Sequence, residues 1–183
     1  MGTGLLMTLG VFILYLVIVF NGLVRLRMLA HNAYADIDVQ LKRRHDLVPS
    51  LVAAVQGHAG YEKGTLEAVV NARNSAQLAK GPAAAGSAEL ALSGQVKQLF
   101  AIAEAYPDLK AGGSFLQLQQ SLVEIEDHLQ NARRYYNAVV RDLNTRIAQF
   151  PAVLVAAPMG FRSEEFFGLE NASEGAVPQV KVG

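Results

Sequence analysis

The chain begins with an uncharged, mostly apolar run from Met1 to Val24, and Arg25 and Arg27 follow it at once. A helix of about 20 apolar residues crosses a hydrocarbon core of roughly 30 Å. The run therefore predicts a transmembrane anchor at residues 1–24. A cleaved secretion signal is the alternative interpretation. It would need a basic N-terminal region, a shorter apolar core and a small-x-small cleavage site, and the sequence shows none of these clearly.

Basic residues follow this run but do not precede it: after Arg25 and Arg27, a Lys-Arg-Arg triplet occupies positions 42–44. Basic residues that flank a membrane span stay on the cytoplasmic side. We therefore expect a single-pass protein with a short external N-terminus and a cytoplasmic body, and with the lipid bilayer as its first partner.

The body, residues 25–169, is long enough to form one domain with its own core. Over the whole chain 16 Lys and Arg balance 16 Asp and Glu, so no basic field favours nucleic acid as a partner. The chain contains no Cys, which excludes disulfides, thiol catalysis, iron–sulfur ligation and a lipid-modified N-terminal cysteine. The body is rich in Ala, Leu, Gln and Glu, and this composition predicts an all-α fold.

Apolar residues recur every three or four positions from Leu26 to Val55, so we expect the first helix to enter the body without a flexible linker. Pro49 predicts a kink or a short break, because it removes a backbone donor and crowds the carbonyl of His45. Three glycines between positions 57 and 64 predict a turn. Helical spacing then returns from Leu66 to about Ala79.

Residues 80–87, KGPAAAGS, predict a loop because Gly, Pro and Ser punctuate them. A third helix is expected from about Ala88 to just before Pro107. After a short turn, Ser114 and Gln117 have the spacing of a capping box at the start of the next helix.

The most regular apolar pattern lies between positions 115 and 150, and Pro151 is expected to end it. Its members are Phe115, Leu118, Leu122, Ile125, Leu129, Ala132, Tyr136, Val139, Leu143, Ile147 and Phe150. This heptad-like seam predicts a helix of roughly 54 Å. The seam must be buried, either against the first helix or against another chain.

The C-terminal segment divides into two parts. The first carries Phe161, Phe166 and Phe167, which are expected to dock on the bundle, either as a flap that closes its end or as a partner-binding surface, since aromatic side chains often anchor interfaces. The second, residues 170–183, is small and polar and is predicted to be disordered.

Local motifs for catalysis are lacking in this sequence. The four histidines are isolated, and the chain carries no HExxH, P-loop, G-x-G-x-x-G or G-x-S-x-G string. We therefore predict no catalytic, cofactor or metal-ligating residues and expect a non-enzymatic protein.

Polar residues beside the apolar stripes form one further candidate set. They are Arg44, Asp46, Glu62, Arg73, Glu104, Glu126, Arg133 and Asn137. Charges beside an apolar seam commonly pair across helices, since an unpaired buried charge costs several kcal/mol. These residues predict an interhelical polar network, or alternatively a ligand or partner pocket.

Several long strings in the chain resemble the LemA family. They are RRHDLVPSLV at 43–52, AEAYPDLKA at 103–111, QNARRYYNAVVRDLNTRIAQFP at 130–151, and the GF…FF pattern at 160–167. The resemblance implies an N-terminally anchored, antiparallel bundle of long helices in a bacterial inner membrane. Family members tend to be encoded near membrane zinc proteases, which implies a link to envelope quality control. Many members place a lipid-modified Cys after the apolar run, whereas this chain reads FNGLV at 20–24.

These observations predict a membrane-anchored adaptor or scaffold that contacts other membrane proteins, among them a membrane protease, and that can form a homo-oligomer. Two alternatives remain open at this point. One is a self-assembling, membrane-shaping protein whose seam pairs between chains. The other is a ligand-binding sensor or enzyme whose site consists of scattered Glu, Arg and Tyr residues.

Overall fold

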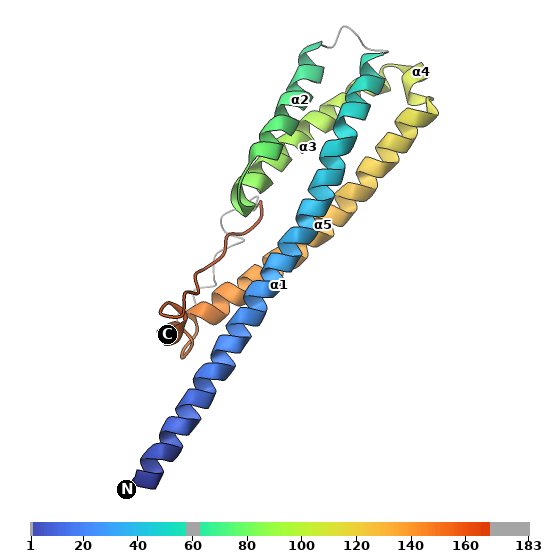
Figure 1. Cartoon of the computed structure of the whole chain (residues 1–183). Helices are drawn as coiled ribbons and strands as arrows, with labels where there is room; N and C mark the ends of the chain where they lie inside the picture. The colour runs from blue at the N-terminus through green and yellow to red at the C-terminus, as the bar shows by residue number, and fades with distance from the viewer. Residues whose placement is uncertain (1, 58–62, 169–183) are drawn as a thin grey trace, which may run out of the picture.

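The computed structural model describes residues 2–57 and 63–168, and every regular element in these ranges is a helix. Helix α1 (Gly2–Gln56) and helix α5 (Gly113–Ala148) are the two longest. They run antiparallel and form the axis of the molecule (Figure 1). Within the described residues, α1 is long and apolar enough to cross a membrane. The all-α fold, with a long apolar N-terminal helix, is therefore confirmed.

Helices α2 (Lys63–Leu78) and α3 (Pro82–Glu104) form a hairpin that packs on the half of α1 and α5 farthest from the N-terminus (Figure 1). With α1 and α5 they make an up-down-up-down bundle. A short helix, α4 (Pro107–Lys110), turns the chain into α5. Another, α6 (Val153–Ala156), follows α5 and contacts α1 near its apolar half.

Two predicted helix starts are wrong. The segment 82–87 is helical, not a loop, because Pro82 occupies the first turn of α3, where its missing N–H and fixed φ are well tolerated. Helix α5 begins at Gly113, and its N-cap is Gly112 with no side-chain hydrogen bond. Ser114 therefore does not form the predicted capping box.

The predicted seam of α5 is buried against α1 of the same chain for most of its length. Leu122, Leu129, Tyr136 and Leu143 are all buried, and α1 is the main neighbour of α5. Phe150 is the exception, with 80% of its surface exposed, because α5 ends at Ala148. The seam is thus an intramolecular packing surface.

Helix α1 passes through Pro49 without a break, so the predicted short break is wrong, and the alternative of a kink stays a prediction. Proline at position 49 leaves the carbonyl of His45, four residues earlier, without its helical donor. The side chain of Arg73, from α2, donates from Nε to that carbonyl oxygen at 2.7 Å. A side chain from the neighbouring helix therefore satisfies the carbonyl that the proline leaves open.

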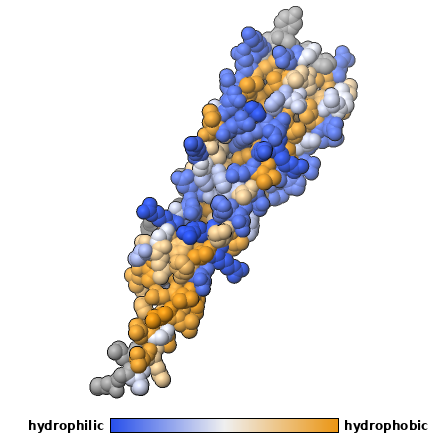
Figure 2. Space-filling model, in the orientation of Figure 1, coloured by the Kyte–Doolittle hydropathy of each residue, from blue (hydrophilic) through white to orange (hydrophobic). Residues whose placement is uncertain are grey.

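The core consists of two apolar clusters, one at each end of the bundle. The first includes Leu23, Ile37 and Leu129, and also α6 and the buried phenylalanines that follow it. The second includes Val55, Leu99 and residues of α2, α4 and the start of α5. Figure 2 shows hydrophilic and hydrophobic residues intermixed over the bundle and an almost continuous hydrophobic surface toward the N-terminal end of α1.

Candidate functional site

A layer of charged residues separates the two apolar clusters, and Arg44 lies at its centre. The Arg44 side chain, buried on α1, places Nη1 3.1 Å from the Glu126 carboxylate on α5 and 3.5 Å from that of Glu89 on α3. Its Nη2 donates to the Ser93 hydroxyl at 2.8 Å. One guanidinium thus connects three helices.

His45, the next residue on α1, completes this polar layer. Its Nε2 lies 2.5 Å from the other carboxylate oxygen of Glu89, and the Glu89 side chain is fully buried. Because an unpaired buried charge is costly, a shift of α1 along α3 that separated these pairs would be unfavourable. Helix α2 joins the layer through Arg73, which bonds to the backbone of His45.

The structure brings together only part of the predicted polar set. Arg44, Arg73 and Glu126 belong to the polar layer, whereas Asp46 and Glu104 are exposed. Glu62 lies outside the described residues. Glu89 and His45 were not predicted for this set, and they carry its most buried contacts.

Arg133 and Asn137 lie on α5 at a second location, where they hold the segment 161–168, here called the strap. The Asn137 amide makes two hydrogen bonds with the backbone of Phe167, at 2.9 and 3.1 Å. Asn144, two turns further along α5, pairs in the same way with the backbone of Glu164. The Arg133 guanidinium lies over the Phe167 ring at 5.4 Å.

The three predicted phenylalanines have different environments. Phe161 and Phe167 are buried, and Phe166 is half-buried. The Phe161 ring packs edge-on against Phe20 of α1, at 5.7 Å between ring centroids, and lies under the guanidinium of Arg27 at 4.9 Å. These contacts favour the flap interpretation over a partner surface made of all three rings.

Gly86 of α3 permits the strap to end where it does. A Cβ atom at position 86 would lie 2.3 Å from backbone atoms of Gly168, a distance that real side chains do not show. Gly168 itself has a φ of +48°, in the region that favours glycine. The strap therefore joins α5 to the start of α3 through a backbone-to-backbone contact.

A groove of about 540 Å³ lies between α1, the strap and the start of α3, and its lining includes Arg27, His31, Tyr34, Tyr136 and Glu164. Burial, together with the charge of Asp38, raises the pKa of Tyr34. Burial also raises the pKa of Tyr136, with contributions from Glu164, Tyr34 and Glu165. Both phenols therefore remain protonated at neutral pH, and the hydroxyl of Tyr136 already donates to the carbonyl of Glu165 at 2.8 Å.

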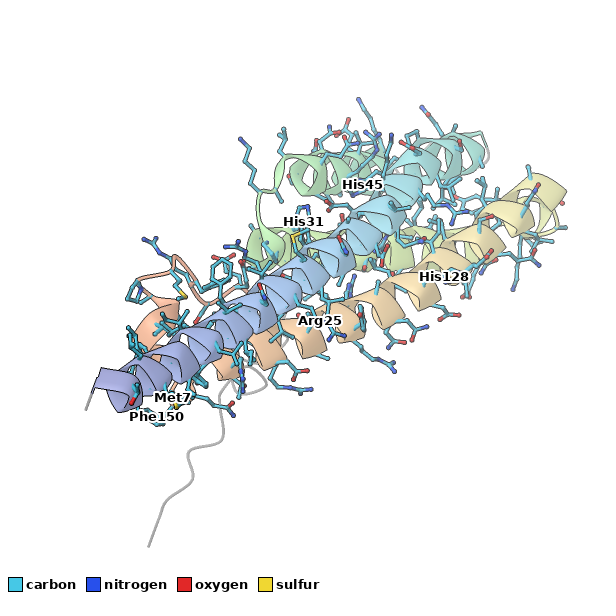
Figure 3. All side chains as sticks on the ribbon, turned by 60° about the horizontal axis from the view of Figure 1, so that its bottom comes forward. Met7, Arg25, His31, His45, His128 and Phe150 are labelled. Carbon is cyan, nitrogen blue, oxygen red and sulfur yellow. The ribbon has the colours of Figure 1, made fainter. Side chains whose placement is uncertain are left out.

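The described histidines do not converge on a common site. Figure 3 shows His31, His45 and His128 at separate positions along α1 and α5. Across residues 2–57 and 63–168, no three His, Asp or Glu side chains gather as a metal ion requires. His58 lies outside the described residues, so the expected lack of a metal site stays a prediction.

Comparison with known proteins gives this fold a context. The chain is 25% identical to magnetosome protein MamQ of Magnetospirillum gryphiswaldense, over 95% of the chain and 74% of MamQ. It is also 25% identical to two MamQ proteins of Paramagnetospirillum magneticum, over 89% of the chain and 70% of each relative. The LemA family profile matches residues 33–182. The chain therefore belongs to the LemA family.

Proposed function

We propose that this LemA-type membrane protein is an anchored adaptor or scaffold whose helical body contacts other membrane proteins. The observation that carries the proposal is the continuity of α1. This helix runs from the apolar N-terminal run through Pro49 to Gln56, and the bundle packs directly on it. A body held without a linker is restricted to a narrow zone beside the bilayer, which raises its effective concentration toward partners there.

The proposed membrane is the bacterial inner membrane, with the body in the cytoplasm. Exposed Arg25 and Arg27 at the end of the apolar run support this orientation. A partner involved in envelope quality control, such as a membrane protease, is proposed from the family resemblance. The MamQ relatives are named for the magnetosome, and we extend to this chain only the broader role of a LemA-type membrane protein.

One observation favours a second candidate, a ligand-binding sensor. The groove beside α1 combines Arg27, Tyr34 and Tyr136 with the carboxylate of Glu164, as expected for a site of scattered Arg, Tyr and Glu residues. The Tyr34 hydroxyl can donate a hydrogen bond to a ligand, and the Tyr136 oxygen, whose hydrogen already bonds to Glu165, can accept one; the raised pKa values of both phenols disfavour the phenolate form. The groove is therefore better suited to binding than to proton abstraction.

Self-assembly through the α5 seam is less favoured, because α1 of the same chain covers this surface. Formation of homo-oligomers would have to use other faces. Two exposed apolar side chains on the body, Val39 on α1 and Val123 on α5, are available for contacts with any partner.

Photo-crosslinking in native membranes tests the adaptor role. A photoreactive residue at position 39 or 123 should form a discrete adduct with a membrane protein. A matched chain that lacks residues 2–14, which stand apart from the core, should lose the adduct while its body keeps its helicity. The proposal is contradicted if the shortened chain that is recovered in the soluble fraction forms the same adduct. It is also contradicted if the purified full chain converts a small molecule and Tyr34→Phe abolishes this activity without unfolding.

A further inference from the structure

The apolar run of α1 extends into the part of the helix on which the body packs. Contact with the bundle core begins at Tyr15, which is partly buried, and Val19 is almost fully buried. The uncharged apolar run continues past this point to Val24, and a helix of about 20 apolar residues is what crosses a hydrocarbon core of roughly 30 Å. If α1 spans the membrane, part of the body that surrounds its residues 15–22 must lie at membrane depth.

The part of the body at this level is the segment 148–161, here called the corner. The sequence contains no charged residue between Arg146 and Arg162. Ala152 and Ala156 of the corner belong to the same buried cluster as Val19 of α1, so one side of the corner packs on the helix. Its opposite side exposes apolar side chains: Phe150 at 80%, Leu154 at 65% and Val153 at 44%.

The exposed apolar surface of the corner is continuous with that of α1. Figure 2 shows a hydrophobic surface that extends from the free end of α1 onto the adjoining end of the body. Figure 3 places Met7 and Phe150 at this same end of the molecule. Isolated apolar residues on a surface are common, but a contiguous patch that adjoins a membrane helix indicates a lipid-facing surface.

The backbone of the corner is also suited to lipid, where an unsatisfied N–H group costs several kcal/mol. Eight N–H groups between positions 149 and 161 bond to carbonyls of the same short segment or of the last turn of α5. Two further positions, Pro151 and Pro158, have no N–H group. The Phe161 N–H, for example, donates to the Ala156 carbonyl at 2.9 Å.

Arginines mark the expected boundary of this surface. Arg44 of α1 pairs with Glu126 of α5, and Tyr34 of α1 lies against Tyr136 of α5. In both pairs the two residue numbers sum to 170, so residues of the two antiparallel helices whose numbers sum to about 170 face one another. Arg146 is thus level with Arg25, and both side chains are exposed. Basic residues at this depth can reach the phosphates of lipid headgroups.

We infer that the corner inserts into the leaflet on the Arg25 side of the membrane, beside the anchor, so that the protein holds the membrane by two segments, one that spans it and one that enters a single leaflet. This inference rests on the proposed membrane anchor and adds a second lipid contact to it. The two contacts together resist rotation and tilt of the body, which a single helix in a fluid bilayer cannot do.

Tryptophan fluorescence tests this inference directly, because the chain contains no Trp. Single Trp residues replace exposed side chains in three full-length variants: Leu154→Trp in the corner, Ile13→Trp in the anchor, and Val123→Trp on the far half of α5. Each variant is reconstituted in vesicles of phosphatidylcholine and phosphatidylglycerol, with or without bromine on the acyl chains. Bromine quenches Trp only at short range.

The inference predicts blue-shifted emission and strong quenching for Leu154→Trp and Ile13→Trp, and neither for Val123→Trp. If Ile13→Trp is quenched and Leu154→Trp behaves like Val123→Trp, the corner lies in water; the inference is then overturned while the anchor stands. If neither Ile13→Trp nor Leu154→Trp is quenched, the anchor fails, and both the inference and the proposed function fall with it.

Discussion

The Nε of Arg73 donates a 2.7 Å hydrogen bond to the carbonyl oxygen of His45, the one carbonyl of α1 that Pro49 deprives of its helical donor. A residue of α2 thus completes the hydrogen bonding of α1 at the point where α1 is weakest. The rigid continuity of α1, on which the proposed placement of the body depends, is therefore a tertiary property rather than a local one.

A double-mutant cycle tests this relationship. Arg73→Ala should lower the free energy of unfolding by about 1.5–3 kcal/mol, the range for a hydrogen bond from a charged group. In a Pro49→Ala background the cost should be clearly smaller, because an alanine at this position supplies the N–H that the His45 carbonyl lacks. Urea denaturation of the four proteins gives the comparison. If Arg73→Ala lowers the free energy of unfolding equally in both backgrounds, Arg73 stabilises the protein through a contact other than the His45 carbonyl.

The polar layer leads to a second prediction. Glu89→Ala leaves Arg44 without its fully buried carboxylate and should cost about 3–5 kcal/mol, as for a broken buried ion pair. Glu126 also pairs with Arg44, but its side chain is 46% exposed. Glu126→Ala should therefore cost only about 0–1 kcal/mol. Thermal denaturation followed by circular dichroism measures both, and a similar loss for the two variants would contradict the assigned roles.

The α5 seam gives a third prediction. Leu129 is fully buried between α5 and α1, whereas its neighbour Gln130 is exposed. Leu129→Ala should cost about 2–5 kcal/mol through lost contacts and the cavity that remains. Gln130→Ala should change the unfolding midpoint little. Comparable effects at the two positions would be incompatible with the register of the seam.

The helices of this fold could largely be predicted from periodicity, because apolar side chains at every third or fourth position require a buried face. The start of α3 could not, since a Gly-Pro pair indicates a turn, and only the packed hairpin shows that Pro82 opens a helix. The burial of Glu89 could not be predicted from the sequence either. Its partners, Arg44 and His45, lie 45 and 44 residues away in the chain, in a helix that is not the main neighbour of α3.

The attachment of the strap could not be predicted for a different reason. Asn137 and Asn144 bind backbone atoms of Phe167 and Glu164, and backbone atoms are the same in every residue. The sequence could place the phenylalanines near the bundle, but it could not identify what holds the segment there.

Tyr136 gives a prediction of pH dependence. Burial, with Glu164, Tyr34 and Glu165, raises the pKa of its phenol in the folded state, whereas tyrosine in an unfolded chain ionises at about pH 10. The stability that depends on the protonated phenol is complete below about pH 10 and is lost as the pH rises above it.

Tyr136→Phe removes both this titration and the hydrogen bond to the carbonyl of Glu165. At about pH 7 the variant should be less stable by about 0.5–1.5 kcal/mol. Its stability should then fall less steeply than that of the parent protein above about pH 10. Urea midpoints at several pH values test the sign, and parallel curves would show that Tyr136 does not contribute to the alkaline transition.

Cysteine labelling in spheroplasts tests whether α1 spans the membrane and holds the body on its cytoplasmic face. The chain has no Cys, so Ile13→Cys and Val123→Cys, both at exposed positions, each introduce a single thiol. With a membrane-impermeant maleimide, we expect Val123→Cys to be labelled only after the membrane is opened, and Ile13→Cys to remain unlabelled throughout. Labelling of Val123→Cys in intact spheroplasts would place the body outside, and labelling of Ile13→Cys would show that α1 does not span the bilayer.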